Sequence, residues 1–557
     1  MEMTAVKKGH PYSLYVLFFT EMWERFGYYL MIGIFFLYLV DPTSNGGKGF
    51  DNARAADIVG TYIALVYLTP FIGGLLADRY LGYRRSIIFG AILMAIGYFC
   101  LALPGLTTMY LSMACVIIGN GMFKPNISTL LGNIYSAEDL KPKKDSAYGI
   151  FYMGINIGAF FCNFVAAYLR HKYGWRAAFS AAGVGMVIGL IWFMAGMKHV
   201  AVGDVKKPLQ KEDMPLSRIF GYVFLPAIIT AIIGWNVSSM IGHTIFGTKS
   251  NDAFMFACVP IIVFYLGLFF RASREDKRGL GALLAFFAVS IVFWVIYNQN
   301  STALTIWAET YTNRSMPKPV EKILEPFNFF QVVTTDSEKV TKIDEHFVAE
   351  VDENGRTMEV MGHDPYLQNL PHDQWPPPHQ PLNLISTEIY QSVNPFFIVL
   401  FTPLIAVWFF GWLRKRNKEP STPAKVTWGM VVAGLSSLFM VLAILSTNIY
   451  EDKTSMAWIT GTYAIFTIGE LLISPIGLSL VSKLSPTRVT ALMMGGWFLV
   501  NSIAGKISGL MATFWDSFPD KKNYFLILFV AAMFSAAIMA MLVKWIRGVI
   551  HEKTGSV

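Results

Sequence analysis

Three charged side chains and a tyrosine share one face of the first apolar stretch of the chain. Glu21, Glu24, Arg25 and Tyr28 lie within a run from about Tyr12 to Val40, which is long enough to cross a bilayer as a helix. Their spacing of i, i+3, i+4 and i+7 places them on one side of that helix. Each ionised group in such a run costs roughly 2.5–3.5 kcal/mol, so this face must point to a polar cavity or to partner helices.

The cluster contains one more acid than base, and two explanations are open. It is either an internally neutralised structural cluster or, as we favour, a functional group that a second cation approaches from elsewhere. Lys124 is the candidate, because it lies far from either end of a later apolar run, within the motif Gly119–Asn126. An unpaired lysine at that depth is costly, and the depth disfavours snorkelling to an interface. Pro125 beside it frees a backbone carbonyl.

A phenol and an amide lie on one face of the run at about 146–170. Tyr152 and Asn156 are four residues apart, so both side chains can reach the same ligand. Hydrogen bonding between helices is the alternative use of such residues in a membrane.

The connection between the second and third apolar runs carries glycines and charged residues, at Gly73–Arg85. The glycines allow two helices to approach closely, and Asp78 and Arg79 can form a latch at a helix end. A static charge cluster at the membrane surface is the alternative.

The composition places these residues in a membrane. Of 557 residues, 54% are hydrophobic and only 15% are charged, which is more apolar surface than a soluble domain of this size could bury. The net charge of +8 comes from basic residues in short connections, which favours membrane orientation over nucleic-acid binding. The four cysteines are too scattered for a disulfide framework or a metal site. The sequence therefore predicts an all-α polytopic membrane protein without a metal or other cofactor.

Fourteen apolar runs have spanning length, and an even number places both ends of the chain on one side. They lie at about 12–40, 56–77, 85–103, 107–133, 146–170, 176–197, 219–240, 252–271, 281–307, 389–413, 426–446, 455–481, 488–514 and 523–547. The first lacks a small-residue cleavage site, so we expect a retained span. Lys and Arg concentrate in alternate connections, with Arg170–Arg176 as the exception, which predicts that both termini are cytoplasmic.

A basic segment, Lys198–Arg218, separates six runs from a pair and then six more. We therefore expect an N-terminal six-helix bundle over 1–198, a cytoplasmic linker with an inserted helix hairpin over 199–280, and a C-terminal six-helix bundle over 281–557. The large polar region at about 309–386 is predicted to be an extended outer loop, because it is rich in proline. Its alternating stretches 347–351 and 357–360 are compatible with a small hairpin.

Several motifs carry a close resemblance to one family. They are ExxERFxYY at Glu21–Tyr29, GNGxFKPN at Gly119–Asn126, FYxxINxG at Phe151–Gly158, Gln391–Pro395, Gly469–Ser479 and Trp497-Phe498-Leu499. Together they resemble the proton-dependent oligopeptide transporter family, the peptide-transporter branch of the major facilitator superfamily. The resemblance covers nearly every span. It implies the superfamily's two six-helix bundles, the inserted pair of prokaryotic members, and a place in the bacterial cytoplasmic (inner) membrane.

The resemblance also implies roles for particular residues. Ion pairs among Glu21, Glu24, Arg25 and Lys124 would exchange as protons bind. Arg25 and Lys124 would hold the carboxylate of a peptide, and Glu470, Asn156 and Asn394 its ammonium group. A zwitterion requires such opposite charges on opposite walls of a low-dielectric cavity. The other substrate-binding candidates are Tyr28, Tyr29, Tyr67, Tyr152, Trp294, Asn298, Trp497 and Asn501, and the gating candidates are Asp78 and Arg79.

Two positions depart from the family pattern. Ile32 stands where family members commonly have an arginine, and Asn298 stands where they commonly have an acid. In the family, this arginine and this acid face each other as an outer gate, and the acid takes part in proton coupling. Losing both charges is electrostatically consistent, whereas losing one would strand the other. Gly60 occupies the position of a histidine in mammalian members. Glu21 and Glu24 are then the best proton acceptors, with Glu470 a weaker one.

We therefore expect a monomeric proton-coupled symporter, embedded in membrane lipid, that imports di- and tripeptides by alternating access. The alternative is a weakly coupled or uncoupled carrier of peptides or other small amphipathic solutes, because of Ile32 and Asn298. A membrane enzyme or a ligand-sensing receptor is disfavoured, since the chain has no HExxH or GxSxG motif and no cytoplasmic signalling domain. No nucleic-acid partner is expected.

Overall fold

The computed structural model describes residues 9–205, 214–316, 318–327, 329–353, 355–486 and 489–554. The predicted domain boundaries include residues 1–8, 206–213 and 555–557, which lie outside this part of the chain.

Each of the fourteen predicted apolar runs corresponds to a helical segment in the described residues. In that part of the chain, twelve segments are long and apolar enough to cross a membrane by length and composition. Their principal helices are α2 (Asn52–Leu76), α3 (Tyr83–Leu101), α4 (Leu106–Ile134), α5 (Lys144–Tyr173), α6 (Trp175–Val200), α8 (Leu225–Ile241), α9 (Lys249–Phe270), α10 (Arg274–Asn298), α13 (Val393–Thr402), α15 (Thr422–Ser446), α16 (Met456–Leu484) and α18 (Lys521–Thr554). The other two long helices are α1 (Tyr12–Val40), which carries the charged cluster, and α17 (Thr490–Thr513).

Short elements extend these helices or build the loop between α10 and α13. The helices are α7 (Leu216–Ile219), α11 (Ala303–Thr310), α12 (Lys318–Leu324) and α14 (Phe410–Lys415). The strands are β1 (Thr312–Asn313), β2 (Phe330–Val333), β3 (Glu338–Thr341), β4 (Glu359–Gly362), β5 (Leu382–Ile385) and β6 (Thr454–Ser455). They pair as a parallel β1–β6, a β2–β5 and an antiparallel β3–β4.

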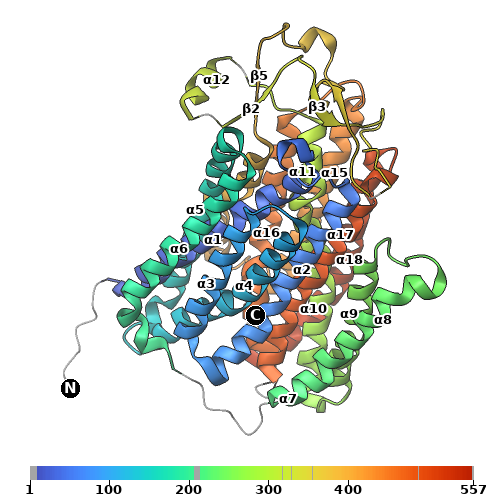
Figure 1. Cartoon of the computed structure of the whole chain (residues 1–557). Coiled ribbons are helices and arrows are strands. Elements are labelled where there is room, and N and C mark those ends of the chain that lie inside the picture. The colour runs from blue at the N-terminus through green and yellow to red at the C-terminus, as the bar shows by residue number, and fades with distance from the viewer. Residues whose placement is uncertain are drawn as a thin grey trace. The chain divides into compact units, whose positions relative to one another are not determined.

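The chain divides into two compact units, and the division falls within both α1 and α2. The first contains Met1–Phe35, Leu65–Gln210 and Leu324–Phe330, and the second contains the rest, including Phe36–Ala64. In the first unit, α3 packs on α4 and α6, and α5 packs on α6. In the second, α15 packs on α16 and α18, α10 on α17, and the inserted helices α8 and α9 on each other (Figure 1). The last turns of α1 and the first half of α2 therefore belong with the C-terminal helices.

Close packing between α3 and α4 depends on a pair of glycines. A Cβ atom at Gly90 would lie 2.5 Å from the carbonyl oxygen of Gly119, and one at Gly119 would lie 2.7 Å from the carbonyl oxygen of Gly90. Any side chain at either position would push the helices apart. Gly119 of the predicted motif thus has a packing role, because it brings α4 close to α3.

The polar region at 309–386 folds on a small apolar core of its own. Its buried members are Val333, Tyr366, Leu367, Leu370 and Leu384. Of the predicted hairpin between 347–351 and 357–360, the described residues form one bridge, Val351–Thr357. The longer pairing joins β3 to β4, with Val340 opposite Val360.

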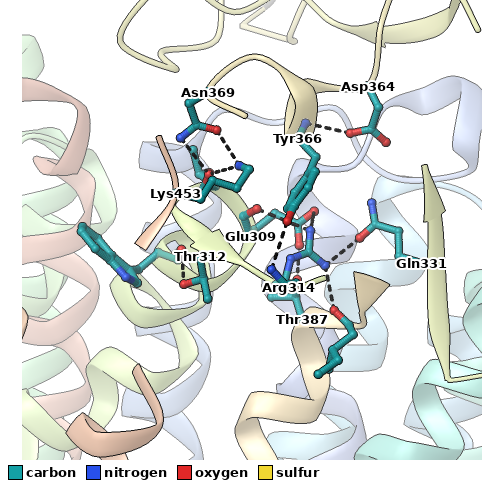
Figure 2. Close-up of polar contacts among 12 residues, drawn as sticks. Glu309, Thr312, Arg314, Gln331, Asp364, Tyr366, Asn369, Thr387 and Lys453 are labelled. Carbon is teal, nitrogen blue, oxygen red and sulfur yellow. Dashed lines mark hydrogen bonds and ion pairs between the residues drawn. The ribbon is translucent and has the colours of Figure 1, made fainter. Parts of the chain in front are cut away.

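Two buried cations organise this loop, as Figure 2 shows: Arg314 lies within the loop, and Lys453 reaches it from the segment before α16. Arg314 is fully buried and donates to Gln331 Oε1 at 2.8 Å and to the carbonyl oxygen of Ile385 at 3.0 Å. Lys453 donates to the carbonyl oxygen of Thr310 at 2.7 Å. Both cations lie against the ring of Tyr366, with Lys453 Nζ 4.0 Å and Arg314 Cζ 5.2 Å from its centroid. Removing either would leave buried acceptors unsatisfied.

Asp364 makes the fold of this loop sensitive to pH. Burial raises the pKa of its carboxyl to about 6, although its Oδ1 accepts a hydrogen bond from the backbone N–H of Tyr366. A raised pKa means that the folded loop binds the proton more tightly than the unfolded loop. The folded loop is therefore favoured below the unfolded value of 3.8 and loses this stability as pH rises towards 6.

Replacing Asp364 with asparagine should stabilise the loop at neutral pH, because it keeps the acceptor for Tyr366 and removes the buried charge. The ratio of wild-type to variant hydrogen-exchange rates in residues 364–370 is expected to be roughly tenfold larger at pH 7.5 than at pH 5. Comparing the two proteins at each pH cancels the intrinsic pH dependence of exchange. The exposed Asp373→Asn is the control, and a ratio independent of pH would contradict the assignment.

Candidate functional site

The predicted charged cluster forms on α1. Glu21, Glu24 and Arg25 are each at most 2% exposed. Arg25 Nη2 donates to Glu24 Oε1 at 2.6 Å, Arg25 Nε donates to the other oxygen of Glu24, and Arg25 Nε lies 3.4 Å from Glu21 Oε1. One guanidinium thus serves two carboxylates, and Glu24 holds it in a fork-like arrangement.

Three buried polar atoms around this cluster have no hydrogen-bond partner in the described residues. They are Glu21 Oε2, Asn120 Oδ1 of α4 and the hydroxyl of Tyr98 of α3. Asn120 does donate to Glu24 Oε1, at 3.4 Å. Buried polar groups are nearly always paired, so unsatisfied atoms gathered at one place indicate a site that takes a proton, a water or a ligand.

Lys124 lies one helical turn beyond Asn120 on α4. Its ammonium group is 4.4 Å from the centroid of the Tyr67 ring and makes no ion pair in the described part of the chain. It interacts electrostatically with Glu21 and Glu24. Lys124 therefore stays the candidate for the second cation, because no carboxylate in the described residues forms an ion pair with it.

The aromatic and amide candidates of the first unit divide into two groups. Tyr28 lies under Arg25, whose Cζ is 5.0 Å from its ring centroid, and its ring meets that of Tyr29 edge to face at 5.3 Å. On α5, Asn156 donates to the carbonyl oxygen of Tyr152 at 2.8 Å, so its oxygen is the atom left for a donor. Tyr152 is 40% exposed.

An acid without a cation marks the second unit. Glu470 of α16 is 5% exposed and makes no ion pair in the described residues. Its Oε2 accepts a hydrogen bond from Asn394 Nδ2 at 2.8 Å, and the same amide nitrogen also donates to Thr467 at 2.9 Å. Asn394 also borders a small cavity of about 20 Å³, lined by Tyr297 and Phe466 among others.

Aromatic side chains form a layer in the same unit. The rings of Trp294 and Trp497 meet at 6.4 Å and 74°, and Phe286 stacks on Trp497 at 5.4 Å. The indole nitrogen of Trp294 is buried without a partner in the described residues. It is a hydrogen-bond donor that could pair with a ligand carbonyl.

The two remaining amide candidates are engaged by their own helices. Asn298 Nδ2 donates to the carbonyl oxygen of Trp294 at 2.8 Å, and Asn501 Nδ2 donates to that of Trp497 at 3.2 Å. Ile32 is buried within the apolar part of α1. Neither departure from the family pattern leaves a stranded charge.

The predicted latch residues Asp78 and Arg79 lie in a single wide turn, η2 (Ala77–Leu81), that continues α2. Asp78 accepts a hydrogen bond from the hydroxyl of Tyr83 at 2.5 Å. The ion pair nearby was missed by sequence reasoning: Arg84 Nε lies 2.8 Å from Asp204 Oδ2. Asp204 comes from the start of the basic linker, where no motif distinguishes it.

A second missed group lies on the second unit. Lys506 of α17 lies 2.6 Å from Asp57 of α2 and is 1% exposed. Each is a charged residue within an apolar run, which was the signal that singled out Lys124.

Comparison with known proteins gives a consistent result. Residues 84–333 and 382–528 match the sequence profile of the POT family. The di-/tripeptide transporter of Lactococcus lactis subsp. lactis is 30% identical over 90% of this chain and 88% of its own length, and the uncharacterized transporter YclF of Bacillus subtilis is 31% identical over 92% and 89%. The structure of a peptide transporter POT in complex with sulfate has a TM-score of 0.74 and 28% identity, covering 97% of this chain and 96% of that one. A POT family transporter in complex with 5-aminolevulinic acid gives 0.75 and 27%, covering 97% of each chain.

Proposed function

Because this chain belongs to the POT family of membrane transporters, we propose that it imports di- and tripeptides together with protons by alternating access. The observation that carries the proposal is a pair of opposite charges, one half-buried and one buried, that no ion pair neutralises in the described residues. One is the ammonium of Lys124, and the other is the carboxylate of Glu470. These charges match the two ends of a zwitterion, and a buried charge is stable only when it is paired.

The peptide carboxylate binds Lys124 and Arg25, and its ammonium group binds Glu470 beside Asn394. Asn156 contributes its free oxygen to the ammonium end. The remaining candidates shape the cavity through their rings and amides. This assignment agrees with what relatives are named for, since di-/tripeptide transporters match the chain over nearly its whole length.

Glu21 is the proton acceptor in this mechanism. Its Oε2 is buried without a hydrogen-bond partner in the described residues, which an ionised carboxylate tolerates poorly and a protonated one tolerates well. A proton on Glu21 weakens its contact with Arg25, 3.4 Å away, and increases the positive charge available to the substrate carboxylate. Proton binding and peptide binding then favour each other.

A carrier with weak or no proton coupling is the second candidate. Ile32 and Asn298 favour it, because an apolar residue and an amide cannot exchange a proton-dependent ion pair. In that case Glu21 and Glu24 serve only to fix Arg25, and peptides or other small amphipathic solutes move down their own gradient.

Uptake of dialanine into liposomes under an imposed inward proton gradient tests the proposal. The purified protein should accumulate dialanine only with the gradient, and Glu21→Gln should abolish accumulation while it retains exchange of dialanine at equal concentrations. The exposed Glu138→Gln is the matched control and should behave as wild type. Accumulation that survives Glu21→Gln would exclude Glu21 as the proton acceptor. A lack of any dialanine transport would exclude dipeptides as the substrate.

We propose that the chain has the domain organisation expected from its sequence. Two six-helix bundles occupy 1–198 and 281–557, and a linker with an inserted hairpin occupies 199–280. The protein is a monomer in the bacterial cytoplasmic (inner) membrane with both termini in the cytoplasm. The clustering of basic residues in alternate connections supports this orientation.

A further inference from the structure

The first half of α2 is held to α17 by a buried ion pair that also involves the inserted hairpin. The three N–H groups of the Lys506 ammonium are all used: Asp57 Oδ1 lies at 2.6 Å, Thr61 Oγ1 at 2.7 Å and Ser250 Oγ at 2.9 Å. Asp57 and Thr61 are one turn apart on α2, and Ser250 is in the first turn of α9. Three helices therefore meet at one cation.

The contact between α2 and α17 continues on either side of this cluster. A Cβ atom at Gly60 would lie 2.6 Å from the Cα atom of Gly509, so the two backbones touch. One end of the contact is closed by a hydrogen bond from Ser502 to the carbonyl oxygen of Ala64 at 2.7 Å. Separation of α2 from α17 would break all of these contacts.

The inserted hairpin holds α17 at a second point. The hydroxyl of Tyr265, on α9, donates to the carbonyl oxygen of Leu492 at the start of α17, at 2.8 Å. Ser250 and Tyr265 are fifteen residues apart on α9 and meet α17 near its two ends, so the helices run side by side. Thr248 caps α9 by accepting a hydrogen bond from Asn251 N at 3.0 Å, which fixes the turn that carries Ser250.

We infer that Asp57 and Lys506 form a gate ion pair that must break in each transport cycle, and that Ser250 of the inserted hairpin positions Lys506 for it. The inference rests on the proposed function, because alternating access requires the first six spans to part from the last six at each end in turn. α2 belongs to the first six spans and α17 to the last six, and the cluster lies on the side that charge distribution assigns to the outside. The pair supplies a charged contact in a chain where Ile32 and Asn298 provide none.

The experiment measures separation of the two helices directly. Ile63, 3% exposed and packed against Gly505, is replaced with cysteine in a protein whose Cys100, Cys115, Cys162 and Cys258 are alanine. The rate of reaction with a membrane-impermeant maleimide reports opening between α2 and α17. Asp57→Asn and Lys506→Met, each alone, should raise this rate at least about tenfold, and Ser250→Ala two- to threefold.

The charge swap Asp57→Lys with Lys506→Asp should return the rate to that of the parent protein, because it restores the opposite charges and the hydroxyl of Ser250 can either accept from an ammonium or donate to a carboxylate. Unchanged labelling in the single variants, or a swap that fails to restore slow labelling, would overturn the gate. Labelling needs no substrate, so absence of dialanine transport by the wild type would remove the proposed function alone. If Ser250→Ala leaves the labelling rate unchanged, Ser250 of the inserted hairpin does not position Lys506.

Discussion

Dialanine uptake should fall about 30-fold or more when Lys124 is replaced with methionine, while the amount of folded protein should stay the same. Methionine keeps an apolar chain against the ring of Tyr67, 4.4 Å from the lost ammonium. Folding should be unaffected because Lys124 makes no ion pair in the described residues. The nearby carboxylates of Glu21 and Glu24 keep Arg25 as their partner. The substrate carboxylate does lose its partner, and truncating one side of a buried charge pair costs roughly 2–5 kcal/mol.

The measurement is the initial rate of uptake into liposomes, normalised to monodisperse protein. A second substrate makes the result specific: dialanine with an amidated C-terminus lacks the carboxylate that Lys124 binds. The wild type should prefer the free carboxylate strongly, and Lys124→Met should treat the two peptides nearly alike. The exposed Lys141→Met is the control, and a carboxylate preference that persists in Lys124→Met would exclude Lys124 from the site.

The candidate residues on α1 could be predicted because helical periodicity alone decides which of them meet. Glu21 and Arg25 are four residues apart, and their side chains lie 3.4 Å from each other as that spacing requires. The depth of a charge in an apolar run is an equally local property, and it is what singles out Lys124 as a candidate that needs a partner. Both inferences use only the geometry of one helix.

Pairs between distant segments could not be predicted, because no local rule relates them. Lys506 and Asp57 are 449 residues apart, and Lys453 reaches the carbonyl oxygen of Thr310 from 143 residues away. The depth rule marks each of the first two as unusual but does not name its partner. In the loop, the position of Arg314 depends on a small apolar core and on strand pairs. Alternating hydrophobicity predicted one of these pairings, at the Val351–Thr357 bridge in the described residues.

The direction of an amide side chain is also beyond the sequence. Asn298 and Asn501 are predicted as ligand contacts through the family resemblance. Each donates to a carbonyl oxygen of its own helix, which leaves the amide oxygen as the group available to a substrate. Their type and depth were informative, whereas the choice between a donor and an acceptor depends on side-chain rotation.

Replacing Glu470 with glutamine should weaken binding of dialanine about 30- to 100-fold and leave binding of N-acetyl-dialanine unchanged. Glutamine is nearly isosteric, and its amide oxygen can still accept the hydrogen bond that Asn394 donates at 2.8 Å. Asn394 is held in turn by Thr467, so this part of the site keeps its geometry. What disappears is the negative charge that a peptide ammonium neutralises, and about 2–3 kcal/mol of charge pairing is lost with it.

Competition against labelled dialanine gives four affinities, those of the free and the acetylated peptide for wild type and for Glu470→Gln. In this thermodynamic cycle the coupling energy measures the interaction between the peptide ammonium and the Glu470 carboxylate. Wild type should discriminate strongly between the free and the acetylated peptide, and the variant should discriminate little. The exposed Glu275→Gln is the control. Equal discrimination in both proteins would mean that Glu470 meets no substrate ammonium. Its burial without a cation would then point to a carboxyl that stays protonated, because an ionised carboxylate at 5% exposure needs a positive partner.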